Sequence, residues 1–211
     1  MLASSADAFT ADRSTDTSVS VQRYATRVTE RPRNPSPREQ ELLDAAYVYV
    51  LEHGLAATSL RPLAAAIGSS TRVLMFLFGN KDGLIRAILA RARREELDAL
   101  RSAAPADADL ATTTLALWRW LSAEAHRPVL RLWVESYSRS LVDPDGPWGG
   151  FAEQTVNDWL TLLDRGNPGS RAEATVALAV LRGALLDLLA TSDQTRTDRA
   201  ITAFTESMAQ P

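Results

Sequence analysis

Cysteine is absent from this chain of 211 residues, which excludes disulfide bonds, thiolate nucleophiles and cysteine-based metal sites. The two histidines, His53 and His126, stand far apart, so we expect no transition-metal site. No run of about 18 apolar residues predicts a membrane-spanning helix, and no charged segment followed by an apolar core predicts a secretory signal at the N-terminus. We therefore expect a cytoplasmic protein with no membrane association, no metal and no other cofactor.

Groups that would indicate catalysis are also missing. No paired carboxylates, no nucleophile beside a base and no phosphate-binding glycine loop stands out in the sequence. An enzyme is therefore not expected, and a binding protein is favoured.

Apolar residues recur at helical spacing along most of the chain, and no alternating pattern of useful length predicts a strand. The sequence therefore predicts an all-α fold. Residues 1–34, rich in Ser, Thr, Asp and Ala, are expected to be a disordered tail. Residues 35–81 are expected to form a three-helix N-terminal domain, 82–104 a connecting helix, and 105–211 a C-terminal helical domain with helices near 108–126, 128–142, 148–164, 171–191 and 197–209.

Charge is divided unevenly between these parts. Residues 31–104 carry 11 Arg and Lys against 8 Asp and Glu, whereas residues 105–211 carry 9 against 14. A basic module joined to an acidic one fits phosphate contact by the first domain alone. The segment Arg31-Pro32-Arg33 either reaches into a minor groove, as some N-terminal arms do, or belongs to a solvated tail.

The most informative stretch is residues 54–81, which hold two short helical patterns on either side of Gly68-Ser69-Ser70. Ser59 and Ser70 are good N-caps for the two helices, and Gly54 and Gly68 suit helix ends. Two helices joined by a short turn containing Gly are typical of a helix-turn-helix, here at about residues 59–78, whose second helix lies in a DNA major groove. The alternative is an ordinary helical hairpin. In the second helix the spacing predicts four inward side chains, Val73, Leu74, Leu77 and Phe78.

A longer series of residues makes the motif more specific. In order, it contains Leu43-Asp44-Ala45-Ala46, Glu52-His53-Gly54, Ala57-Thr58-Ser59-Leu60-Arg61, Leu63-Ala64, Gly68 and Phe78-Gly79-Asn80-Lys81-Asp82-Gly83-Leu84. With this series, residues 38–97 resemble the N-terminal domain of TetR-type transcriptional regulators. Downstream of these residues only the helix-rich pattern agrees with that family.

The resemblance implies a set of DNA-binding residues. Thr71, Arg72, Val73 and Met75 match base-reading positions, and chemistry agrees, because Arg pairs with guanine and an apolar side chain packs on a thymine methyl group. The position of Arg61 contacts DNA in the family. Residues at the phosphate-binding positions are Ser59, Ser70 and Lys81, and Phe76 completes the implied set.

The chain departs from the family pattern at Met75, Phe76 and Leu77, where TetR-type proteins often carry Tyr or His against the sugar-phosphate backbone. Two explanations stay open. Either phosphate anchoring shifts to Ser, Arg, Lys and backbone groups, or one of the three apolar residues belongs to the core.

The C-terminal domain contains a segment, residues 174–190, that is apolar almost all round and so needs burial on more than one face. An internal core and a partner subunit would cover it, and a place in a monomeric bundle is the alternative. In TetR-type proteins the last two long helices of each subunit form a four-helix dimer interface. On this basis the expected interface residues are Ala179, Gly183, Ala184, Phe204 and Met208.

All five tryptophans lie in the C-terminal domain, and large aromatics with one polar group suit an apolar ligand pocket. The predicted lining residues are Trp118, Trp133, Glu135, Tyr137, Phe151 and Trp159. Plain core packing is the alternative for each of them. His126 is a candidate polar contact, although a role at a helix end fits it better.

Taken with the resemblance, the sequence predicts a homodimeric, ligand-responsive transcriptional regulator of double-stranded DNA. It would be a repressor that an unknown small-molecule effector releases from a palindromic operator. The alternative is a helical dimeric binding module that has lost specific DNA recognition.

Overall fold

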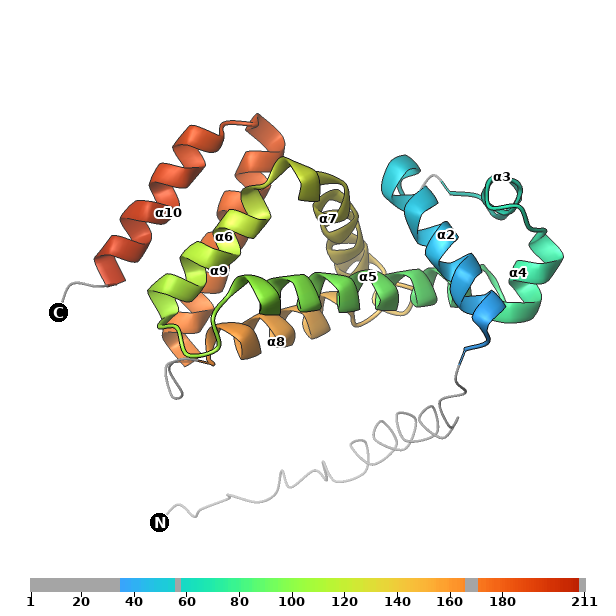
Figure 1. The fold of residues 1–211 in the computed structure, drawn as a ribbon, viewed down its shortest axis with the longest axis horizontal. Coiled ribbons are helices and arrows are strands. Elements are labelled where there is room, and N and C mark those ends of the chain that lie inside the picture. Colours follow the sequence, from blue (N-terminus) through green and yellow to red (C-terminus); the bar gives the residue numbers. More distant parts are fainter. Residues whose placement is uncertain (1–34, 56–57, 166–170, 209–211) are drawn as a thin grey trace, which may run out of the picture. The chain divides into compact units, whose positions relative to one another are not determined.

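The computed structural model describes residues 35–55, 58–165 and 171–208, and within these ranges it contains nine α-helices, one 3-10 helix and no strand (Figure 1). The all-α prediction is therefore confirmed for the described part of the chain. The expected tail at 1–34, with Arg31-Pro32-Arg33, lies outside the described residues. Arg38–Pro211 form one compact unit.

Three short elements make up the N-terminal part of this unit: α2 (Pro37–His53), α3 (Leu60–Ala66) and α4 (Thr71–Phe78). Pro37 opens α2, as its missing N–H allows at a first helical position. Gly54, with φ of 78°, follows its last turn in the left-handed conformation that ends helices. The three helices share one apolar core, to which α2 contributes Leu42 and Ala46, α3 contributes Leu63 and α4 contributes Leu74.

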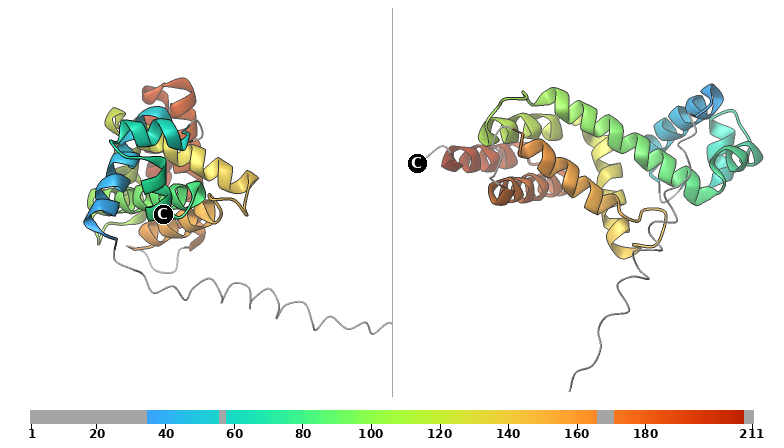
Figure 2. Two further views of the ribbon diagram at one scale, coloured as in Figure 1. Left: turned by 90° about the vertical axis from the view of Figure 1, so that its right-hand side faces the viewer. Right: turned by 90° about the horizontal axis from the view of Figure 1, so that it is seen from below.

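The long helix α5 (Lys81–Ala103) begins where Asn80 caps it, because the Asn80 side-chain oxygen accepts a hydrogen bond of 2.7 Å from the Gly83 backbone N–H. Near its start α5 packs against α4, and further along it packs against α6, α7 and α8. Figure 2 shows it running from the helix-turn-helix into the remaining helices. Arg91 on α5 also holds α2, through an ion pair of 2.8 Å with Asp44 and a position 4.4 Å above the centre of the Tyr47 ring.

The body, a name used here for residues 104–208, contains α6 (Leu110–Ser122), the 3-10 helix η1 (Glu124–His126), α7 (Arg127–Val142), α8 (Phe151–Leu163), α9 (Arg171–Thr191) and α10 (Gln194–Met208). Helix α10 packs against α6 and α9, and α8 packs against α7 and α9 (Figure 1). The indole N–H of Trp118 on α6 donates a 2.7 Å hydrogen bond to Asp198 on α10, which fixes this corner of the body.

Three helix ends differ from the sequence-based expectation. The helix expected at 108–126 ends at Ser122, and His126 Nδ1–H then donates a 2.7 Å hydrogen bond to the Trp120 carbonyl and stacks on the Trp120 ring. The helix expected from 148 starts at Phe151, after Gly150 in the left-handed conformation. The last helix starts at Gln194 rather than 197, because the Asp193 carboxylate accepts the Arg196 backbone N–H at 3.0 Å.

Helix α9 is long and apolar enough to cross a membrane by length and composition, although one-third (33%) of its most apolar window is buried. Core helices of other folds meet the same criterion. Here α9 packs against α6, α8 and α10, with Leu178, Leu181 and Leu185 buried. The burial of these leucines explains the apolar character of one side of α9, whereas the other side of the helix is exposed.

Truncation of the side chain should affect stability very differently at two positions of α4. Leu74 is 1% exposed and Phe76 is 86% exposed. We expect Leu74→Ala to lower the free energy of unfolding by about 2–5 kcal/mol, because it leaves a cavity in the core. The matched variant Phe76→Ala should change it by no more than about 0.5 kcal/mol. Urea denaturation followed by circular dichroism measures both, and equal losses would contradict the described orientation of α4.

Candidate functional site

The turn between α3 and α4 is built from backbone and capping contacts. Gly68, with φ of 64°, lets the chain leave α3, and the Ser69 N–H donates to the Ala64 carbonyl at 2.8 Å. Ser70 has the extended conformation of an N-cap, and its hydroxyl accepts the Val73 N–H at 3.2 Å. These contacts fix the direction in which α4 starts relative to α3.

The nine residues predicted to bind DNA are all exposed in the structure: Ser59, Arg61, Ser70, Thr71, Arg72, Val73, Met75, Phe76 and Lys81. Val73 and Met75 are each 39% exposed, so the prediction that Val73 points inward is wrong. Leu74 alone anchors α4 as a fully buried residue, and Leu77 and Phe78 are partly buried against the core. Of the three apolar residues in doubt, Phe76 is therefore a surface residue and Leu77 is partly a core residue.

Three cations lie in the first turns of three successive helices: Arg61 in α3, Arg72 in α4 and Lys81 in α5. Within the described part of the chain, none of these three side chains forms an ion pair. Helix N-termini also present unsatisfied backbone N–H groups that attract anions. This surface therefore combines cationic side chains and N–H donors, which is the chemistry that holds phosphates.

The residues predicted to line a ligand pocket lie in four places. Trp133 and Tyr137 of α7 and Trp159 of α8 form one cluster, with the Trp133 ring centre 5.1 Å from Tyr137 and 6.4 Å from Trp159. Trp118 lies on the α6–α10 contact described above. Phe151 lines a separate cleft between α5 and the start of α8.

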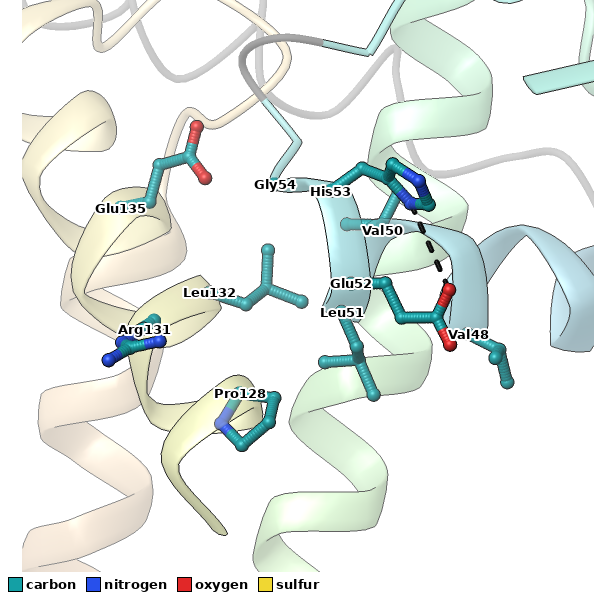
Figure 3. Close-up of a pocket in the computed structure, with 10 residues that line it drawn as sticks. All are labelled: Val48, Val50, Leu51, Glu52, His53, Gly54, Pro128, Arg131, Leu132 and Glu135. Carbon is teal, nitrogen blue, oxygen red and sulfur yellow. Dashed lines mark ion pairs between the residues drawn. The ribbon is translucent and has the colours of Figure 1, made fainter. Parts of the chain in front are cut away.

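Glu135 lies in the fourth place, where it faces the helix-turn-helix rather than the aromatic cluster. Its carboxylate accepts the Leu55 N–H at 3.2 Å. Figure 3 shows Glu135 and Leu132 of α7 opposite Gly54 and the last turn of α2, across a cleft also lined by Arg131. Glu135 thus links the body directly to the end of α2.

Residues 42–88 match the family described as bacterial regulatory proteins, tetR family. This part of the chain is a tetR-family domain. The match spans α2 to the first part of α5, so it covers the helix-turn-helix and confirms the resemblance found in the sequence.

Curated relatives agree with about half of the chain. The HTH-type transcriptional regulator BetI of Paraburkholderia xenovorans (strain LB400) is 29% identical over 110 residues, which are 51% of this chain and 56% of the relative. BetI of Burkholderia mallei (strain NCTC 10229) is 30% identical over the same shares of both chains. The chain therefore matches little more than half the length of these relatives.

Solved structures extend the likeness to the body. The multidrug binding protein EbrR complexed with imidazole is 26% identical, with a TM-score of 0.66 over 88% of this chain and 97% of that one. A TetR transcription regulator from Haloarcula marismortui ATCC 43049 has a TM-score of 0.65 over 80% and 94% of the two chains, and at 16% identity it shows the fold alone. The chain therefore carries a tetR-type helix-turn-helix domain and is similar to TetR-family transcriptional regulators.

Sequence reasoning missed one buried residue, Glu96 of α5. It is 5% exposed, and burial raises its pKa to about 8; the Trp159 indole and Arg93 lower the pKa, and Asp158 raises it. Leu97, the next residue of α5, is only partly buried. The signal was present in the sequence, because Glu96 stands four residues after Ala92 and four before Leu100, in phase with the core.

The buried carboxyl should make stability depend on pH. Glu96 is protonated up to about pH 8 in the folded state and ionises near 4.5 when exposed. The folded chain therefore binds an extra proton between these values, so stability should fall as pH rises from about 5 to 8. In Glu96→Gln this part of the pH dependence should vanish. Thermal unfolding at several pH values measures it, and parallel curves for wild type and variant would contradict the burial of an ionisable Glu96.

Proposed function

We propose that the chain is a ligand-responsive regulator that binds double-stranded DNA as a homodimer and works in the cytoplasm. It represses from a palindromic operator and is released by a small-molecule effector. The observation that carries the proposal is the exposure of all nine predicted DNA-binding residues on α3, α4 and the start of α5. The family match over residues 42–88 supports it.

Phosphate binding and base reading fall to different residues in this proposal. Ser70, which caps α4, Ser59, which precedes α3 without a capping hydrogen bond from its side chain, and the cations Arg61 and Lys81 hold the sugar-phosphate backbone of the DNA. Arg72, Thr71 and the apolar side chains of α4 meet base edges, where Arg pairs with guanine and Met75 or Val73 packs on thymine methyl groups.

A second copy of the chain would cover the exposed side of α9. That side carries small and apolar residues at spacings of three and four, namely Ala172, Val176, Ala179, Gly183, Leu186 and Ala190, all exposed. Val176 is 53% and Leu186 49% exposed, which is unusual for large apolar side chains unless a partner covers them. Ala184, Phe204 and Met208, the other predicted interface residues, pack in part against the core of their own chain.

Effector binding is assigned to the body. The structural neighbour EbrR is described as a multidrug binding protein and was solved with imidazole and with proflavin. In the present chain, α5 belongs to both the helix-turn-helix core and the body core, so an effector that favours a different position of α5 would change the separation of two reading heads. A coupling of about 1–3 kcal/mol is typical of such regulation.

A second candidate function follows from the apolar surface of α4. Met75 and Phe76 offer no hydrogen bond to a phosphate, and the exposed Phe76 suits a protein partner as well as a nucleic acid. The chain would then be a dimeric helical binding module without specific DNA recognition.

Selection of bound duplexes from a random pool, followed by gel-shift titration at several salt concentrations, separates the two functions. A regulator should enrich a palindromic sequence, and its affinity should fall as salt rises, because bound phosphates release counterions. Failure to enrich any duplex at low salt would leave only the binding module.

Arg72→Ala tests base reading. We expect it to weaken operator binding by about 1–3 kcal/mol and to relax the preference at one base position, because a bidentate contact to guanine is lost. Arg119→Ala, which removes an exposed arginine of α6 in the body, is the matched control and should bind normally. Unchanged affinity and preference in Arg72→Ala would remove Arg72 from the base-reading set.

Gly183→Leu tests the dimer surface. Nothing lies within 4 Å of a Cβ placed on Gly183, so one copy should fold normally with the larger side chain. Overpacking between two copies should shift the monomer–dimer equilibrium by about 1–3 kcal/mol toward monomer, as measured by analytical ultracentrifugation. Ser138→Leu, on an exposed position of α7, is the control. An unaltered dimer would place the interface elsewhere.

A further inference from the structure

One short helix, α4, carries three of the eight large apolar side chains that are exposed among the described residues: Val73, Met75 and Phe76. Phe76 is the most exposed of the eight, at 86%. Single apolar residues on a surface are ordinary, but three within four positions of one helix form a patch, and apolar patches are typical of binding surfaces. The patch therefore needs an occupant.

Leu74 fixes which side of α4 faces outward, because it is the one fully buried residue of this helix. Successive helical residues are turned by about 100°, so the residues two positions before and two positions after Leu74 both lie about 160° away from it. These residues are Arg72 and Phe76, and both are exposed. Because they are four positions apart, their Cβ atoms lie about 5–6 Å apart on one line of the helix.

Val73 and Met75 lie on the two flanks of that line, each about 100° from Leu74. They are less than half as exposed as Phe76, and Leu77 and Phe78 are partly buried against the core. A guanidinium and a phenyl ring therefore stand furthest out from the core on the exposed face of α4.

The charge around the patch favours a polyanion as its occupant. Between Thr58 and Lys81 the chain has three cations and no acidic residue. The major groove of DNA combines phosphates with the methyl groups of thymine, which are the apolar features of its base edges. A surface that offers both cations and apolar side chains matches this groove better than it matches an apolar protein partner.

A phenyl ring cannot replace a polar residue as a phosphate anchor, since it has no hydrogen-bonding atom. The TetR-type pattern often has Tyr or His at Met75, Phe76 and Leu77, against the sugar-phosphate backbone. In this chain, Arg61 and Lys81 in the first turns of α3 and α5 can hold the backbone instead. The ring of Phe76 is then available for an apolar contact with a base.

We propose that Arg72 and Phe76 read each operator half-site as a pair, with Arg72 on a guanine and Phe76 on the methyl group of a thymine one or two base pairs away. One helical turn of about 5.4 Å separates the two side chains along α4, and stacked base pairs are about 3.4 Å apart. This inference rests on the proposed function. It adds a base step that the operator must contain.

The first experiment removes the thymine methyl group and nothing else. The guanine is identified as the base whose preference relaxes in Arg72→Ala, and the nearby thymine of each half-site in the selected operator is replaced by deoxyuridine. Burial of one methyl group contributes about fourfold to affinity, so substitution in both half-sites should weaken binding by the natural chain about fifteenfold. Deoxyuridine outside the half-sites should change nothing. Gel-shift titration measures each affinity.

The second experiment shows whether Phe76 makes that contact. Phe76→Ala should bind the thymine and deoxyuridine operators equally within about twofold, because the group that contacts the methyl is gone. Val142→Ala is the matched control, since Val142 is an apolar residue of the body that is 85% exposed, and it should keep the full fifteenfold difference. If Phe76→Ala fails to fold by circular dichroism, the comparison of the two operators with the natural chain decides alone.

Four outcomes would overturn the pair: an Arg72→Ala variant with unchanged base preference, an operator with no thymine within two base pairs of the guanine, an affinity that ignores the missing methyl group, or a Phe76→Ala variant that still distinguishes the two operators. Each of them leaves the proposed regulator in place, because a palindromic duplex is still bound. Failure to enrich any duplex is a different result, since it removes the regulator and the pair together.

Discussion

The continuity of α5 is the constraint on which the rest of the structure depends. Its first turns contribute Leu84 and Ile88, and its later turns contribute Leu100, to the one continuous apolar core of the described residues. A helix transmits a rotation or a shift along its axis because each turn is hydrogen-bonded to the next. Both the helix-turn-helix and the body pack on this one element, so neither can rearrange at α5 without involving the other.

Two further contacts restrict the movement of the helix-turn-helix relative to α5 and α7. Arg91 on α5 holds Asp44 and the face of Tyr47 on α2, and Glu135 on α7 accepts the backbone N–H that follows α2. Burial and the nearby Glu95 raise the pKa of Tyr47 to about 12, so this phenol stays neutral at physiological pH. Helix α2 is thus clamped between α5 and α7 by polar contacts that can be exchanged more readily than a packed apolar core.

Local signals in the sequence were sufficient for the existence of the elements and for the exposed surface of the helix-turn-helix. Gly54, Gly68 and Ser70 adopt the conformations that their chemistry predicts, and the exposed face of α4 follows from helical spacing around Leu74. Val73 was misassigned because an eight-residue helix has only a narrow buried stripe. The boundaries at Ser122 and Gln194 depend on contacts of His126 and Asp193 that no periodicity reveals.

The interior of the body was less predictable. Trp118, Glu135 and Phe151 had been grouped with Trp133 because all are large or polar residues in one domain, yet they lie on different helix contacts. Which aromatic residues meet depends on how helices cross, and single-sequence patterns carry no information about crossing. Glu96 was overlooked because an acidic residue is normally assigned to the surface. Only its helical spacing with the buried residues of α5 indicated that its side chain points inward.

Lysine occurs once in this chain, and that residue opens α5 beside the helix-turn-helix. Every other basic side chain is a guanidinium or an imidazole, so amine-directed acylation has a single side-chain target. Acetylation there removes one positive charge from the surface that α3, α4 and α5 share and leaves the arginines untouched. Acylation of this one nitrogen would therefore alter the electrostatics of that surface and leave the charges of the body unchanged.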